Sequence, residues 1–224
     1  DLEPAGFGAG EVALMSQGRV FWRRKPRGHS LNCAMPNRHD GWAMKYPTRA
    51  DISEMKAGGC EAQTIAGAEA RLERGIAAEQ LCKVIEDAFD GVVLGGGVGL
   101  QEAQGIDDYK DEATCAAYRA GDEKDDWRKI AAEALNVCNS SLSFFDAAGM
   151  RFHLPAYLIC ELRGDYRFHM AFCLTQTYQT IPEKFSLLNR QQRTAVRRYL
   201  LHILDDPEYA HDRPHIERAL DEFW

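Results

Sequence analysis

The sequence predicts a mainly α-helical fold, with a single helical domain of about five to six helices over residues 66–224 behind a poorly ordered N-terminal arm. Three observations support this prediction. Large apolar side chains gather in residues 140–164, apolar residues recur at helical spacing in residues 81–89 and 190–204, and residues 1–65 show no sustained period. The pattern leaves room for one short strand or hairpin.

The N-terminal arm, residues 1–65, is expected to be largely irregular because Gly, Pro, Arg and Asn interrupt its apolar runs. Arg19–Trp22 could form one short strand. Residues 1–60 hold nine Lys and Arg against six Asp and Glu, a charge of +3, whereas the rest holds eighteen against twenty-eight, a charge of −10. A natural start at Met55 is an alternative, in which residues 1–54 would not belong to the natural protein.

Helical spacing begins after the arm. A helix is expected from about Ala66 to Asp90, ended by Gly91, with a glycine-rich loop over residues 91–99. Its apolar stripe includes Leu81, Val84, Ile85 and Phe89. Asp107 and Asp122 are expected to cap the next two helices, the first of which ends near Ala120.

The core is expected in residues 140–164, where burial of each large apolar side chain contributes roughly 1.5–3 kcal/mol. Leu154 precedes a proline and is biased away from helical geometry. We therefore expect a short helical turn, a bend at His153 and Leu154, and a helix from Pro155 to about Leu162, stopped by Gly164. A single helix kinked at Pro155 is the alternative.

The last third begins with an expected strand and ends with helices. Phe168, Met170, Phe172 and Leu174 alternate with smaller or polar residues, which is a strand period. Asn189 and Gln192 then form the signature of a capping box before an amphipathic helix that ends at Asp205. Asp212 is expected to cap a final helix.

Residues 81–204 resemble an uncharacterised bacterial family, a domain of unknown function. The resemblance rests on LSFFDAAGMRFHLPAYL, preceded by DEKDDW, together with GVGLQEAQGIDDY and QQRTAVRRYLLHIL. It implies no activity. His153 stands where the family often has an aromatic residue.

No cofactor is expected. The run Gly95–Gly99 lacks the Gly-Lys-Ser/Thr of a phosphate-binding loop, and its expected neighbours are helices, whereas a dinucleotide site needs a β-α-β unit. A connection between helices is the favoured interpretation.

Two groups of residues are candidates for chemistry. Asp107, Asp111 and Asp122 belong to an acidic zone that could hold a hard cation, although a solvated surface that caps helices is favoured. Arg151, His153 and Tyr157 are the catalytic candidates because a histidine titrates near neutral pH, although a buried, hydrogen-bonded histidine is favoured.

The favoured function is that of a cytoplasmic, non-catalytic interaction module with a protein partner. Widely scattered cysteines indicate reduced thiols, and no run of residues is apolar and long enough for a membrane span. One alternative is a metal-dependent or acid–base enzyme that uses the acidic zone and His153. Another is a protein that contacts nucleic acid through the basic segment Phe21–His29, although the net charge of −7 argues against nucleic acid.

Overall fold

The computed structural model describes residues 12–16, 19–23, 45–176 and 181–224. The burial of side chains is described for residues 45–176 and 183–224. The chain divides into two compact units, Asp1–Pro36 and Asn37–Trp224. In the first unit, β1 (Val12–Ser16) pairs antiparallel with β2 (Arg19–Arg23), and Val12 lies opposite Arg23. β2 coincides with the expected strand.

The second unit begins with two packed helices, of which only the second is predicted from the sequence. α1 (Arg49–Ala57) lies within the stretch expected to be irregular, and α2 (Ala62–Ala88) starts four residues earlier than expected. Thr48 and Asp51 form a capping box, in which the Thr48 N–H donates to Asp51 Oδ2 over 2.6 Å. Ile52 is buried, and α1 packs against α2. The cap and the burial of Ile52 therefore both stabilise α1.

The central helix is α6 (Ala147–Arg163), and twelve of its residues are buried. Phe152, Leu158 and Leu162 are at most 1% exposed, which confirms the predicted core. The expected bend at His153 and Leu154 is wrong, because α6 continues through Pro155 as one helix. The cost of a missing backbone donor at Pro155 is outweighed here by burial on every side of the helix. Gly164 ends α6 with a left-handed φ of 86°, as expected.

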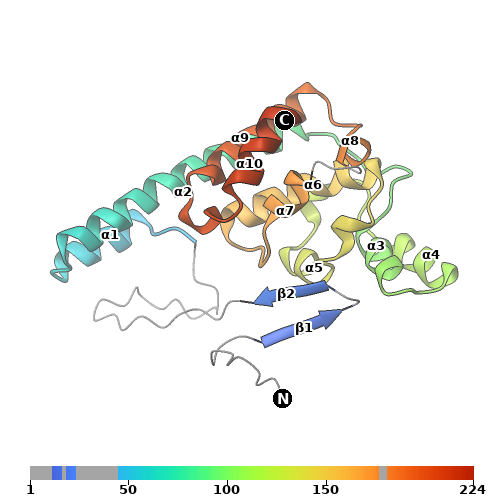
Figure 1. The fold of residues 1–224 in the computed structure, drawn as a ribbon, viewed down its shortest axis with the longest axis horizontal. Coiled ribbons are helices and arrows are strands. Elements are labelled where there is room, and N and C mark those ends of the chain that lie inside the picture. The colour runs from blue at the N-terminus through green and yellow to red at the C-terminus, as the bar shows by residue number, and fades with distance from the viewer. Residues whose placement is uncertain (1–11, 17–18, 24–44, 177–180) are drawn as a thin grey trace, which may run out of the picture. The chain divides into compact units, whose positions relative to one another are not determined.

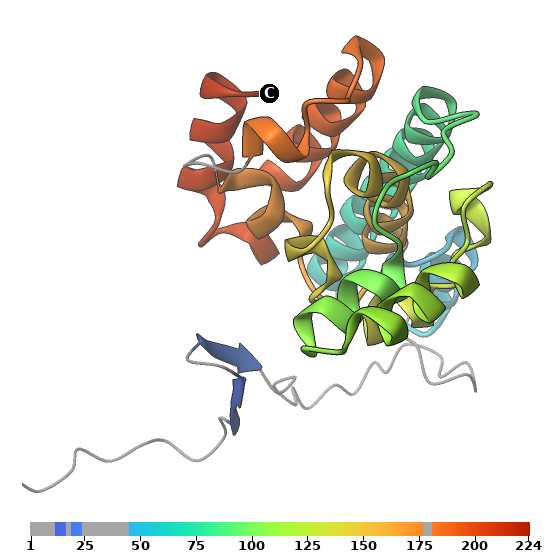
Figure 2. The same ribbon diagram turned by 90° about the vertical axis from the view of Figure 1, so that its right-hand side faces the viewer.

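The other helices surround α6 (Figures 1 and 2). α2 packs against both α6 and α9, and the pairs α3–α4 and α9–α10 lie on different sides of α6 (Figure 2). The elements are α3 (Leu100–Asp107), α4 (Glu112–Gly121), η1 (Trp127–Lys129), α5 (Ala132–Val137), η2 (Ser141–Ser143), α7 (Met170–Thr175), α8 (Ile181–Lys184), α9 (Arg190–Leu204), η3 (Pro207–Tyr209) and α10 (Arg213–Glu222). The mainly helical class is confirmed, but the described residues form more helices than the five to six expected.

The strand expected at residues 168–174 is wrong, because residues 170–174 belong to α7. Met170, Ala171 and Leu174 are fully buried, whereas Phe168 and Phe172 are 43% and 58% exposed. Burial therefore follows the spacing of a helix, since the alternating pattern would have placed both phenylalanines inside with Met170.

Candidate functional site

His153 is a core residue. Its side chain is fully buried and stacks on Phe145, with ring centroids 4.3 Å apart. Nδ1 lies 2.7 Å from the Gly149 carbonyl oxygen, so Nδ1 carries the proton and Nε2 does not. Nε2 is buried without a hydrogen-bond partner among the described residues. Burial lowers the pKa of His153 to about 4, which keeps the ring neutral at neutral pH.

The other two catalytic candidates do not share a reactive centre with His153. Tyr157 is buried and donates to the Cys138 carbonyl oxygen over 3.3 Å. Arg151 is only partly buried, and its Nε has no hydrogen-bond partner among the described residues. The hydrogen bonds of His153 and Tyr157 are made to backbone carbonyls and hold the fold together.

The acidic candidates Asp107, Asp111 and Asp122 lie at or beside the ends of helices. Asp111, rather than Asp107, caps α4 and accepts from the Thr114 N–H over 2.8 Å. Asp107 is the last residue of α3. Asp122 caps no following helix but accepts from the Gln101 and Glu102 N–H groups at the start of α3. No group of three or more His, Cys, Asp or Glu side chains suited to a metal ion occurs in the described part of the chain.

The glycine-rich loop packs closely against the first turn of α6. A Cβ atom on Gly97 would lie 2.6 Å from the Gly149 nitrogen, so a side chain there would collide with the first turn of α6. Asp146 fastens the contact, because its Oδ1 accepts from both the Val98 and Gly149 N–H groups. Gly97 is therefore required by close contact with the backbone of α6.

The densest polar cluster lies elsewhere, around Glu161, and we call Glu161, His169, Tyr199 and Tyr209 the Glu161 cluster. The Glu161 side chain is only 3% exposed. Its Oε2 accepts from Tyr199 Oη at 2.5 Å and from the Met170 N–H at 2.8 Å. Its Oε1 accepts from Tyr209 Oη and from His169 Nδ1, the latter at 3.1 Å. One carboxylate therefore joins α6, the start of α7, α9 and η3.

The environment shifts the pKa values within the Glu161 cluster. The hydrogen bond to Glu161 raises the pKa of His169, although burial acts in the opposite direction. Burial and the neighbouring carboxylate raise the pKa values of Tyr199 and Tyr209, which keeps both hydroxyls protonated as donors. His169 is 47% exposed, so the cluster presents one titratable ring to solvent.

Sequence reasoning missed this cluster. A glutamate within an apolar helix, such as Glu161, is expected to be exposed or to pair with an arginine such as Arg151 or Arg163, and the alternating pattern places His169 on a strand. Instead, Arg163 pairs with Glu79 on α2. The available signal was a carboxylate inside an apolar helix, which predicts burial with several hydrogen-bond donors, but the donors come from segments up to 48 residues away.

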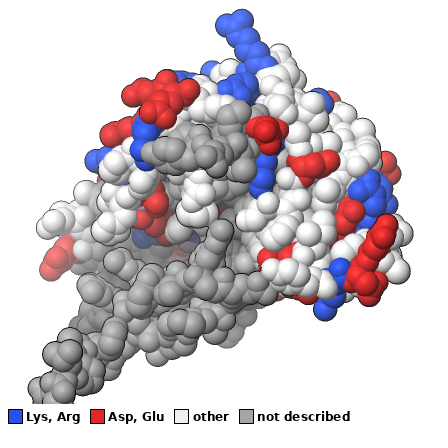
Figure 3. Space-filling model, turned by 45° about the vertical axis from the view of Figure 1, so that its right-hand side comes forward, with Lys and Arg blue, Asp and Glu red and all other residues white. Residues whose placement is uncertain are grey.

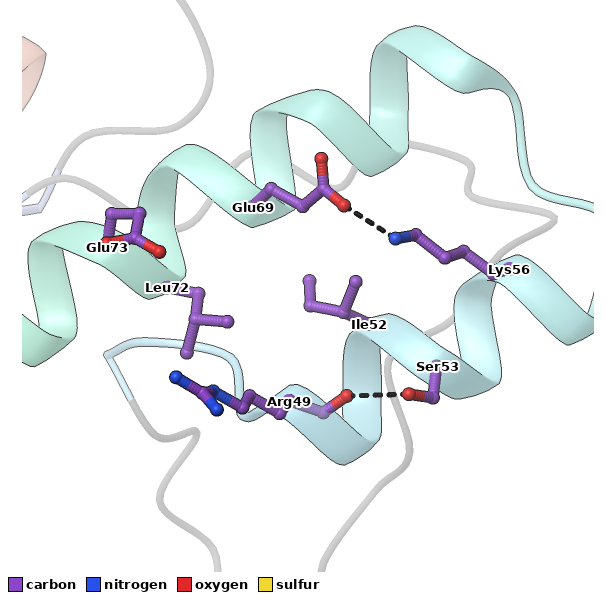
Figure 4. Close-up of a pocket in the computed structure, with 7 residues that line it drawn as sticks. All are labelled: Arg49, Ile52, Ser53, Lys56, Glu69, Leu72 and Glu73. Atoms are coloured by element: carbon purple, nitrogen blue, oxygen red, sulfur yellow. Dashed lines mark hydrogen bonds and ion pairs between the residues drawn. The ribbon is translucent and has the colours of Figure 1, made fainter.

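Two open grooves border α2. The groove between α1 and α2, of about 410 Å³, has Ile52 and Leu72 between charged residues (Figure 4). There Lys56 pairs with Glu69 over 2.7 Å. The groove between α2 and α9, of about 420 Å³, has a different lining and contains no acidic residue. Its lining residues are Gln80, Leu81, Val84, Arg198, Leu201 and His202.

Most of the basic segment Phe21–His29, the candidate for nucleic-acid contact, lies outside the described residues, because these omit residues 24–44. On the face of the molecule in Figure 3, basic and acidic side chains are interspersed among uncharged ones. The described residues on that face form no single-sign patch suited to a phosphate backbone.

The remaining observations concern membranes and thiols. None of the described helices combines the length and apolar character that a membrane span requires. Cys82, Cys115, Cys138, Cys160 and Cys173 have free thiols. Cys60 is disulfide-bonded, so the prediction of reduced thiols is wrong at this residue.

Comparison with known proteins agrees with the resemblance. Searches of curated proteins and of solved structures find no match. The model of a family of unknown function, DUF6714, matches residues 77–224, from within α2 to the last residue. This range contains α6, the Glu161 cluster and both walls of the groove between α2 and α9. The chain therefore belongs to the DUF6714 family of unknown function.

Proposed function

We propose that this protein is a non-catalytic interaction module whose groove between α2 and α9 binds an acidic amphipathic helix of a partner protein. The observation that carries the proposal is the lining of that groove. Leu81 and Val84 form an apolar wall on α2, and Leu201 on α9 is 45% exposed. Apolar side chains in a groove between two packed helices can receive the apolar face of a third helix.

The charge of the groove between α2 and α9 favours an acidic partner. Arg198 borders the groove, is exposed, and makes no ion pair or hydrogen bond among the residues that the structure describes. Since no acidic side chain lines the groove in a chain of net charge −7, its local charge is opposite to that of the whole molecule. A partner helix with Asp or Glu beside its apolar face would pair with Arg198.

The groove between α1 and α2 fits this role less well. Its two basic residues, Arg49 and Lys56, face two acidic residues, Glu69 and Glu73, and Lys56 already pairs with Glu69 (Figure 4). Its charges are therefore balanced internally, and the groove offers a partner no charge preference.

Peptide selection tests the proposal. A random-peptide display library is selected against the full chain, and the enriched peptides are measured by fluorescence anisotropy. We expect apolar residues at i, i+3, i+4 and i+7 with Asp or Glu beside them. Leu201→Glu and Arg198→Glu should each weaken binding at least about tenfold, since burying an unpaired charge or reversing an ion pair costs more than 1.4 kcal/mol.

The matched control is Val137→Glu, which changes another exposed apolar residue, on α5. It should leave peptide affinity unchanged. Selected peptides that lack the helical pattern, or that bind Leu201→Glu as tightly as the native chain, would refute the groove as the binding site.

We also propose a cytoplasmic location in a bacterial cell. The five free thiols support this location because free thiols persist in reducing compartments, whereas the disulfide at Cys60 is the observation against it.

A further inference from the structure

The Glu161 cluster joins four elements through one side chain. Glu161 lies on α6, and its Oε2 accepts from the Met170 N–H at the start of α7 and from Tyr199 on α9. Its Oε1 accepts from Tyr209 in η3. Both tyrosines are fully buried. Because these three donors follow Glu161 by 9, 38 and 48 residues, the carboxylate holds three later segments of the chain against α6.

His169 is the member of the Glu161 cluster that can exchange protons with solvent. Its side chain is 47% exposed, whereas that of Glu161 is 3% exposed. Nδ1 lies 3.1 Å from Glu161 Oε1 and 3.0 Å from Tyr209 Oη, and the ring packs edge-to-face on Tyr209 with centroids 4.8 Å apart. A carboxylate only accepts hydrogen bonds, so Nδ1 carries a proton in the neutral ring as well as in the charged one. A second proton, taken up from water, therefore adds a positive charge beside the buried carboxylate and breaks no hydrogen bond.

The groups that face His169 favour its charged form. Glu161 faces it from α6 and Glu208 from η3, and both raise the pKa of His169. Burial lowers this pKa, as does Lys45 from the segment before α1, but the balance is upward. The two tyrosines of the cluster keep their protons near neutral pH, because burial raises their pKa values. His169, rather than a tyrosine, is therefore the group that changes its charge near neutral pH.

We propose that the His169–Glu161 pair is a pH-sensitive contact, which holds η3 and the start of α7 against α6 while His169 is protonated and lets them open when the proton leaves. The buried charge of Glu161 provides the reason. Taking a carboxylate out of water costs free energy, and a positive partner within hydrogen-bond distance offsets part of that cost. When the ring loses its second proton, the hydrogen bond from Nδ1 remains but the opposite charge is gone. Local opening of η3 then brings water to Glu161.

The closed arrangement should weaken as the pH rises. Because the pKa of His169 is raised in the closed state, that state binds the proton more tightly than the open state does. The added stability is fully present below the ordinary histidine pKa of about 6.5 and is lost as the pH rises through the higher pKa of the closed state. Burial lowers the pKa of His202 on α9, so its titration lies below this range of pH. The proposal does not depend on the groove between α2 and α9.

Hydrogen exchange followed by NMR tests the proposal on the full chain. The Met170 N–H reports on its bond to Glu161, and the Tyr209 and Asp212 N–H groups report on η3 through their bonds to the Asp206 and Tyr209 carbonyl oxygens. Protection factors, corrected for the intrinsic effect of pH on exchange, are compared at about pH 6 and about pH 8.5, on either side of the expected transition. Protection of these three amides should fall at least about threefold at the higher pH, whereas protection within α6 should stay unchanged.

His169→Gln separates the charge from the hydrogen bond, because a glutamine amide can donate to Glu161 but does not titrate. In this variant, protection of the three amides should no longer depend on pH. The matched control is His211→Gln, which removes an exposed histidine just beyond η3 and should retain the native pH dependence. Leu201→Glu should retain it too, so this proposal and the helix-binding proposal fail separately. An equal loss of protection in the native chain and in His169→Gln, or no loss in the native chain, would overturn the inference.

A titration of the His169 ring by NMR tests the role of Glu161 directly. The ring signal is assigned by its loss in His169→Gln. The pKa should lie above the ordinary value of about 6.5 in the native chain and fall in Glu161→Gln. It should rise further in Tyr209→Phe, which keeps the carboxylate and removes a hydroxyl that shares Oε1 with His169. Circular dichroism identifies which variants are folded, and an identical pKa in all of the folded variants would overturn the role of Glu161.

Discussion

At the scale of single residues, the buried polar groups divide by what they contact. His153 bonds a backbone carbonyl and stacks on Phe145, whereas His169 bonds a buried carboxylate and keeps its ring half in solvent. The two histidines therefore respond oppositely to their surroundings, since the pKa falls at His153 and rises at His169. Residue type alone does not distinguish these roles.

His153→Phe should remove a pH dependence of stability. The native pKa of about 4 lies below the ordinary value of about 6.5, so between these values the unfolded chain binds the proton and the native chain does not. The native chain should therefore lose stability as the pH falls from about 6.5 to 4, by up to about 3 kcal/mol from this residue. Phenylalanine can keep the stack on Phe145 without titrating.

Urea unfolding at pH 7 and pH 4.5 measures this effect. The difference in unfolding free energy between the two pH values should shrink in His153→Phe and stay unchanged in His211→Gln. An undiminished difference in His153→Phe would show that His153 is not the titrating group.

Gly97→Ala should destabilise the protein by about 1–3 kcal/mol, the range for overpacking a tight site. The added methyl group would lie 2.6 Å from the Gly149 nitrogen. Gly96→Ala is the matched control, because a Cβ atom at Gly96 meets nothing within 4 Å. Thermal unfolding compares the two variants. Equal midpoint temperatures would show that the close contact is not the reason why residue 97 is a glycine.

At the scale of elements, the ends of helices are set by residues close in the sequence, whereas the packing of helices against one another depends on residues far apart. The capping box of Asn189 and Gln192 and the stop at Gly164 were predicted because their partners lie within a few residues. α1 was missed although Thr48 and Asp51 carry the same kind of signal, because its apolar content is too small to be noticed. The segment of α7 resembles a strand in sequence because six residues are too few to separate the two-residue period of a strand from the 3.6-residue period of a helix.

Thr48→Ala should selectively weaken α1. The substitution removes one side of the capping box, and such caps contribute about 1 kcal/mol. Among the described elements, α1 packs mainly on α2. Hydrogen exchange should therefore accelerate across residues 52–57 and stay unchanged in α6. Ser53→Ala, which removes only a bond to the Arg49 carbonyl, is the control, and faster exchange throughout the chain would contradict the prediction.

At the scale of the whole molecule, the second unit is organised around α6. The composition and the apolar cluster of residues 140–164 predicted this core correctly, because burial is a bulk property of many side chains. The Glu161 cluster could not be predicted in the same way, since it depends on where Tyr199 and Tyr209 meet α6 after folding. Sequence patterns therefore predict the position of the core, whereas the Glu161 cluster is formed by tertiary contacts that these patterns do not contain.

Leu158→Ala should cost about 2–5 kcal/mol, because its side chain is fully buried at the centre of the unit. Leu201→Ala, on the exposed side of α9, should cost less than about 0.5 kcal/mol. Urea unfolding followed by far-UV circular dichroism and by tryptophan fluorescence should give coincident transitions for both variants. Separate transitions would show that α6 does not hold the unit together.

The contact between α2 and α9 brings together segments far apart in the sequence. Arg74 on α2 donates to the His202 and Asp205 carbonyl oxygens, 128 and 131 residues later. A nascent chain on the ribosome therefore displays α2 long before α9 has been synthesised, and half of the groove is missing throughout that interval. A helix that needs both walls would discriminate between finished molecules and unfinished ones, so its binding would act as a quality check on the fold.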